Sequence, residues 1–169
     1  MTNNHILDEL ERNGVVFETL LHDLPDEMVR WRPAVGKWNL LEIICHLLDE
    51  EREDFRVRLS MLLKDPNAAL PSINPEGWVT QRNYQDQDFE STLDVVILER
   101  EKSVERLRSL KNAHWENEFN HPKFGGMSAQ LFLENWLAHD YLHMRQIIAT
   151  KFAYLKEFGS EPLNYAGNW

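Results

Sequence analysis

Apolar residues recur every three or four positions along four stretches of the chain, and the segments between these stretches hold most of the prolines and glycines. This spacing is typical of helices that bury one face. The first predicted helix begins after Asn3 or Asn4 and ends before Pro25. Its other face is polar, so we expect that face to meet solvent.

The second predicted helix begins with a capping box. Asn39 can accept a hydrogen bond from a backbone N–H of the first turn, while Glu42 reaches back to the N–H of Asn39. The apolar stripe that follows continues until Pro66, and proline ends a helix. Residues 65–87 then show no sustained period and form the longest predicted loop, which is the kind of segment that often carries function.

The last two predicted helices complete the pattern. The third runs from about Phe89 to Leu110, and the fourth follows Ser128 as its N-cap and continues to about Lys156. Residues 114–126 between them are expected to form a loop. Because no strand-like alternation of comparable length competes, the sequence predicts one all-α domain over residues 1–169, most simply a four-helix bundle.

The charge balance narrows the classes of partner. The chain has 18 Lys and Arg against 28 Asp and Glu, a formal net charge of −10 at pH 7. This excess disfavours nucleic acid and anionic membranes as partners, because both are bound mainly through Lys and Arg. The single cysteine, Cys45, excludes an intramolecular disulfide and a CxxC motif, and we expect it to pack in the core. With neither a signal region nor an apolar run of membrane-spanning length, the prediction is a cytoplasmic protein.

Three histidines suggest a metal site. His139 and His143 lie four apart in the inward stripe of the last predicted helix, and His46 lies at the edge of the stripe of the second. Imidazoles one turn apart can bind one cation, and three imidazoles without a thiolate favour Zn, Ni or Fe over Ca or Mg. Three protein ligands would leave coordination positions open, and Asn135 and Gln146 could orient the rings. On spacing alone, hydrogen-bonded core histidines stay a valid alternative.

Other residues could complete such a site. Glu50, one turn beyond His46, could orient a ligand or act as a catalytic base, or it could be a solvated surface charge. Arg100 is the one cation in an inward stripe, so it could bind a substrate carboxylate, or its head could extend to water. Trp38 and Trp78 could line a substrate pocket, although aromatic residues more often pack in a core.

Several segments together resemble the DinB/YfiT-like superfamily. They are KWNLLEIICHLLDEE (residues 37–51), HPKFGGMS (residues 121–128), WLAHDYLHMRQI (residues 136–147) and NYAGNW (residues 164–169). The resemblance implies a four-helix bundle in up-down-down-up order, often as a homodimer. It also implies a divalent metal bound by one histidine of the second helix and two of the fourth, and His46, His139 and His143 match those positions.

The resemblance implies a range of activities. The family includes thiol-dependent enzymes, such as mycothiol-dependent maleylpyruvate isomerase and bacillithiol transferases. A Lewis-acidic metal lowers the pKa of a bound small thiol and so supplies a nucleophile. We therefore expect a metal-dependent, thiol-dependent transferase or isomerase that acts on a small electrophile. Two alternatives stay open: a non-catalytic metal-binding or stress-response bundle, and a metal-assisted hydrolase with Glu50 as its base.

Overall fold

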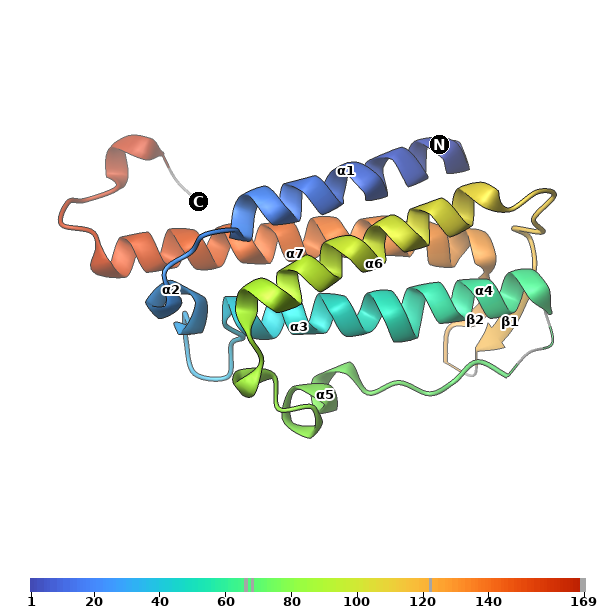
Figure 1. Ribbon diagram of the computed structural model, residues 1–169, viewed down its shortest axis with the longest axis horizontal. Helices are drawn as coiled ribbons and strands as arrows, with labels where there is room; N and C mark the ends of the chain where they lie inside the picture. Colours follow the sequence, from blue (N-terminus) through green and yellow to red (C-terminus); the bar gives the residue numbers. More distant parts are fainter. Residues whose placement is uncertain (66, 68, 122, 168–169) are drawn as a thin grey trace.

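Four helical rods form the body of the protein (Figure 1), in a computed structural model that describes residues 1–65, 67, 69–121 and 123–167. The rods are α1 (Asn3–Leu21), the continuous series α3 (Leu40–Asp49), π-helix η1 (Glu50–Phe55) and α4 (Arg56–Lys64), then α6 (Phe89–Ser109) and α7 (Ala129–Phe158). In Figure 1, α1 and α7 run in one direction, while the α3–α4 rod and α6 run in the other. The predicted four-helix bundle in up-down-down-up order is confirmed.

Each rod packs against two others. Helix α1 contacts α6 and α7, and the α3–α4 rod contacts the same two helices from the other side. The second and fourth predicted helices therefore lie side by side. Their contact is the one that a site shared between His46 and the α7 histidines requires.

Side-chain caps mark the start of all four rods, including α6, where Asp88 accepts from the Ser91 N–H at 2.9 Å. The Asn39 side chain accepts from the Glu42 N–H at 2.9 Å, and the Glu42 carboxylate accepts from the Asn39 N–H at 3.0 Å, so the predicted capping box is confirmed. Ser128 Oγ accepts from the Leu131 N–H at 3.0 Å, as predicted. The first rod begins at Asn3, one residue before the predicted range, because Thr2 and not an asparagine is its N-cap.

The connections between the rods hold short elements that the periodicity did not predict. They are α2 (Asp26–Arg30), α5 (Pro75–Gln81), the 3-10 turns η2 (Tyr84–Asp86) and η3 (Asn164–Ala166), and strands β1 (Glu118–His121) and β2 (Gly125–Ser128). The prediction of a simple loop over residues 114–126 was wrong, because β1 and β2 form an antiparallel hairpin. Four-residue strands are too short to produce a clear alternation. Pro66, the predicted helix end, lies outside the described residues, as do residues 168 and 169 of the predicted domain.

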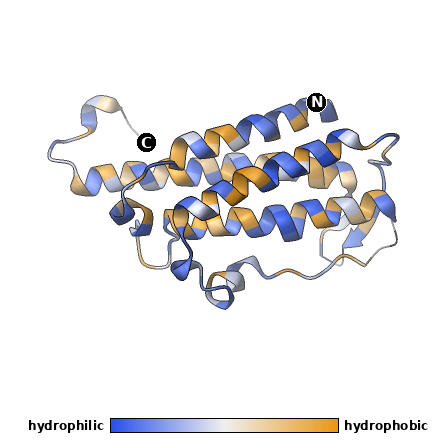
Figure 2. Ribbon diagram, in the orientation of Figure 1, coloured by the Kyte–Doolittle hydropathy of each residue, from blue (hydrophilic) through white to orange (hydrophobic). Residues whose placement is uncertain are grey.

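The interior has two apolar clusters with a polar layer between them. One cluster gathers around Phe17, Ile44 and Leu93, and the other around Leu59 and Trp136. The layer between them consists of Asn13, His46, Glu50, Glu51, Arg100, His139, Asp140 and His143. Figure 2 shows polar positions along every rod, and no helix among the described residues is long and apolar enough to cross a membrane.

Candidate metal centre

Three imidazole rings from two rods meet in the polar layer. His46 Nε2 lies 3.3 Å from His139 Nε2, which in turn lies 3.1 Å from His143 Nε2. One ring nitrogen from each of the three lies within 4.8 Å of the others. His46 and His143 are buried, and His139 is half-buried. The structure thus brings together the three residues that the spacing and the resemblance selected, hereafter called the triad.

The positions of the triad follow from helix geometry and from two aromatic neighbours. His139 and His143 are one turn apart on α7, so they lie on the same face. The Trp38 ring lies 4.8 Å from the His46 ring, and the Phe55 ring lies 5.1 Å from the His139 ring. The sequence predicted Trp38 as a pocket residue but did not predict Phe55. The one sequence feature that pointed to Phe55 was its position in the apolar stripe of the second predicted helix.

Burial keeps these rings neutral. It lowers the pKa of His46 to about 3 and that of His139 to about 2, and neighbouring imidazoles add to both shifts. The pKa of His143 is also lowered by burial. All three rings therefore carry no charge at neutral pH, the state in which an imidazole binds a metal.

The hydrogen bonds of the outer ring nitrogens bear on metal binding. His143 Nδ1 lies 2.9 Å from Gln146 Oε1, and since an amide oxygen only accepts, Nδ1 carries the proton and Nε2 keeps its lone pair. His46 Nδ1 is buried without a hydrogen-bond partner among the described residues. Asn135, the other predicted helper, donates to the Leu131 carbonyl instead. Three converging neutral nitrogens fit a borderline divalent ion such as Zn, Ni or Fe.

Glu50 is not a solvated surface charge. Its residue is 5% exposed, at the start of the π-helix. Burial raises the pKa of its carboxyl to about 8, and the neighbouring Asp54 carboxylate contributes to the shift. The side chain is therefore protonated at neutral pH, in contrast to the surface carboxylate that the sequence allowed as an alternative.

Arg100 binds groups of the protein itself, a role that differs from the two predicted ones, binding a substrate carboxylate and extending to water. Its guanidinium is buried and donates to Glu51 Oε2 at 3.0 Å, to both carboxylate oxygens of Asp140 at 2.6 and 2.8 Å, and to the Leu10 carbonyl at 3.0 Å. These contacts use its nitrogens within the protein, so it does not extend to water and has no free group to bind a substrate. Glu51 also accepts from the Trp136 indole at 3.0 Å.

Trp78 lies away from the triad. Its ring packs under the Arg82 guanidinium, 4.2 Å from the ring centroid, and the residue belongs to the apolar cluster around Phe17. The structure therefore places one of the two predicted pocket tryptophans, Trp38, against the triad, and gives Trp78 a packing role at the end of the bundle.

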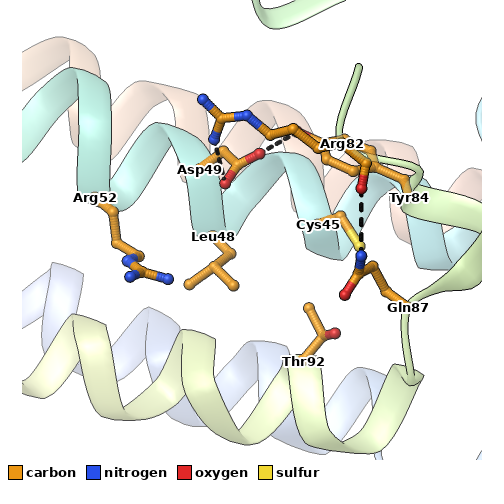
Figure 3. A pocket seen from close by; sticks show the side chains of 8 residues that line it. All are labelled: Cys45, Leu48, Asp49, Arg52, Arg82, Tyr84, Gln87 and Thr92. Carbon is orange, nitrogen blue, oxygen red and sulfur yellow. Dashed lines mark hydrogen bonds and ion pairs between the residues drawn. The ribbon is translucent and has the colours of Figure 1, made fainter. Parts of the chain in front are cut away.

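A separate cavity of about 200 Å³ lies between α3, the η2 connection and α6 (Figure 3). None of the residues that line it belongs to the triad. Cys45 borders this cavity, and burial raises the pKa of its thiol to about 12, so the thiol stays protonated at neutral pH. The Tyr84 hydroxyl and the Arg82 guanidinium both donate to the Asp49 carboxylate, which ties the η2 connection to α3.

Comparisons with known proteins agree with this architecture. The family model described as the DinB superfamily matches residues 9–147. YfiT from Bacillus subtilis, described as a probable metal-dependent hydrolase with an unusual four-helix bundle topology, superposes with a TM-score of 0.78 at 16% identity, over 88% of this chain and 85% of that chain. TT2238, described as a four-helix bundle protein, gives a TM-score of 0.57 at 18% identity, over 88% and 99% of the two chains.

No curated protein sequence matches this chain significantly. At identities below one in five, the two superpositions show the fold, not a shared activity. The family model, however, covers most of the chain, including all three triad positions. This chain belongs to the DinB superfamily.

Proposed function

We propose that the protein is a divalent-metal-dependent enzyme that transfers a small thiol to an electrophile. The observation that carries the proposal is the triad: three neutral imidazoles, two buried and one half-buried, with one nitrogen each within 4.8 Å of the others. Among the described residues three protein ligands converge, a number typical of catalytic rather than structural metal sites. The description of YfiT as a probable metal-dependent hydrolase supports the metal dependence.

The chain's own residues would hold the site in shape. Bound by the triad, a Zn, Ni or Fe ion would supply Lewis acidity that lowers the pKa of a thiol at an open position. Gln146 keeps the His143 Nε2 lone pair free by accepting a hydrogen bond from the Nδ1–H group. Trp38 and Phe55 flank two of the rings and limit their freedom to turn.

The state of Glu50 favours a thiol over water as the nucleophile. Water has a pKa near 15.7 and a free thiol one of about 8.5, so a thiol needs far less help to ionise. A protonated Glu50 cannot accept a proton from water at neutral pH. Three neutral ligands also leave the full charge of the ion to attract an anionic sulfur.

Hydrolysis is a second candidate, because YfiT is described as a probable metal-dependent hydrolase. In that case Glu50 would act as the base, and it would have to be ionised when substrate is bound. The two candidates differ in one requirement, since only transfer consumes a thiol.

Paired activity panels on the purified protein separate these candidates. The protein is loaded with Zn, Ni or Fe, and each form is assayed with a panel of small thiols and a chromogenic electrophile, and in parallel with chromogenic esters and amides. Turnover that needs both metal and thiol supports the proposal. Turnover of esters or amides without a thiol supports hydrolysis, and about one bound ion per chain with no turnover in either panel supports the non-catalytic alternative.

A matched pair of histidine variants ties activity to the triad. His143→Ala removes a proposed ligand, whereas His5→Ala removes an exposed imidazole near the start of α1. Only the first variant should lose bound metal by elemental analysis, and only the first should lose turnover. Equal metal content in the two variants would exclude the triad as the binding site.

A further inference from the structure

The carboxyl group of Glu50 has an unusual surrounding for a buried acid. Its residue is 5% exposed, and in the part of the chain that the structure describes its one hydrogen-bond partner is the Asp54 carboxyl. No N–H or hydroxyl group of another residue donates to it there. A buried carboxylate without donors is strongly unfavourable, so this pair needs a proton between its two members.

Arg58 determines which of the two acids carries that proton. Its guanidinium forms an ion pair with Asp54, four residues before it, and both side chains are nearly buried, at 11% and 13% exposure. This contact stabilises Asp54 as the ionised member. The proton is therefore held by Glu50, and its O–H group donates to Asp54.

The pair lies in a row that begins at the triad. His46, Glu50, Asp54 and Arg58 follow each other at intervals of four along the continuous α3–η1–α4 rod. Residues four apart lie one above the other on a helix, and the wider π turn keeps this relation close. At the far end, Arg58 lines a cavity of about 350 Å³ together with residues 70–73 and the β1 residues Phe119 and His121.

Charged groups on the neighbouring helices are engaged elsewhere. The π-helix packs against α6 and α7. On α6, Arg100 and Glu99 bind other partners, and on α7 His139 belongs to the triad. Asp49, on α3, accepts from the η2 connection and acts on Glu50 only as a nearby negative charge. Burial therefore sets the state of Glu50 together with Asp54 and Arg58, and Asp49 adds a smaller contribution.

We propose that Glu50 and Asp54 form a proton-sharing pair that serves the metal centre, with Glu50 as the proton donor and Asp54 and Arg58 as its positioning residues. This inference rests on the proposed function. In the transfer, the Glu50 O–H bond breaks as its proton passes to the atom X that leaves the electrophile. The thiol loses its S–H proton as its sulfur bonds to carbon, and the pair takes up one proton only after Glu50 has given up its own. One S–H and one C–X bond break, and one S–C and one X–H bond form.

Infrared spectroscopy of the metal-free protein tests the pair without any activity. We expect a protonated carboxyl C=O band at pH 7 that Glu50→Gln removes and that Glu101→Gln, at an exposed glutamate of α6, leaves unchanged. Asp54→Asn should shift the pH midpoint of this band downward by at least one pH unit, because an amide can donate to an ionised Glu50. Absence of the band at pH 7, its persistence in Glu50→Gln, or an unchanged midpoint in Asp54→Asn would each overturn the proposal.

Kinetics of the metal-loaded protein test the role of the proton. Glu50→Gln should lower kcat about 100-fold, the lower end of what proton transfer contributes, with metal content and the KM for the thiol unchanged. If Glu50→Gln loses the carboxyl band but keeps the wild-type kcat, the Glu50 proton takes part in no step of the reaction. That result would overturn the role of Glu50 as proton donor. Lack of turnover in the wild-type protein would count against the proposed function instead, and the infrared result would still decide whether the pair exists.

Discussion

At the residue scale, the centre depends on groups whose state is set by their surroundings rather than by their type. The triad imidazoles are neutral because they are buried next to one another, and Glu50 is protonated because it is buried next to Asp54. The sequence could place His139 and His143 on one face through their spacing. It could not assign Glu50, because helical spacing alone does not distinguish a buried carboxyl from a solvated one.

The triad makes the stability of the metal-free protein depend on pH. The pKa of His139 in the folded protein lies far below the ordinary value of 6.5. Below pH 6.5 the unfolded chain therefore binds more protons than the folded protein does. The free energy of unfolding falls as the pH is lowered through this range. Between pH 6.5 and 5, the free energy of unfolding should fall about 1–2 kcal/mol more in the wild-type protein than in His139→Met.

Urea denaturation at the two pH values measures this difference. Glu50 has the opposite sign, since its raised pKa lets the folded state bind a proton that the unfolded chain releases above about pH 4.5. That contribution is common to both proteins and cancels in the comparison. Equal pH dependence in the two proteins would mean that His139 is not held neutral by the fold.

Gln146 offers a test of how the triad is oriented. Its side-chain oxygen fixes the tautomer of His143, and loss of such a hydrogen bond typically weakens metal binding about 10–100-fold. We expect Gln146→Ala to show this loss in competition with a chelator. Asn135→Ala, which removes an amide bonded to its own helix, should leave the affinity unchanged. A loss as large in the second variant would point to a general effect on α7.

At the element scale, the sequence was most informative where a local rule decides the outcome. The capping box at Asn39 and the N-cap at Ser128 placed two helix starts correctly, because caps act within one turn. The π-helix and the β-hairpin were missed. A single wide turn leaves the apolar period almost intact, and the pairing of Glu118 with Ser128 joins strands of only four residues.

The cap of α3 should contribute more to stability than an ordinary cap. Asn39 is fully buried, and besides the cap its amide donates to the Arg30 carbonyl at 3.2 Å and to Gln85 Oε1 at 3.3 Å. Asn39→Ala should therefore lower the free energy of unfolding by about 2 kcal/mol. Thr2→Ala, at the exposed cap of α1, should cost about 1 kcal/mol or less in the same denaturation experiment. Equal costs would contradict this account of the buried cap.

At the scale of the whole molecule, Arg100 joins all four rods through the polar layer. It extends from α6 and donates to Leu10 of α1, Glu51 of the π-helix and Asp140 of α7. The sequence showed that Arg100 lies in an inward stripe but not what it meets there, because its carboxylate partners are 40 and 49 residues away. Only the folded topology brings these groups together.

Removal of Arg100 should leave two buried carboxylates without their cation. We expect Arg100→Met to lower the free energy of unfolding by about 3–5 kcal/mol, the usual cost of breaking a buried ion pair. Arg106→Met, at an exposed position on the same helix, should change it by about 0.5 kcal/mol or less. Urea denaturation of both variants provides the measurement, and a small effect at Arg100 would show that the buried cluster is not what holds the rods together.

A crystal structure of the metal-loaded protein, with anomalous diffraction at the absorption edge of the metal, tests the central claim most directly. The account predicts one ion within about 2.0–2.2 Å of Nε2 of His46, His139 and His143, with at least one remaining position held by a group that is not part of the protein. An ion bound elsewhere, or an ion closed off by a fourth protein ligand, would contradict it.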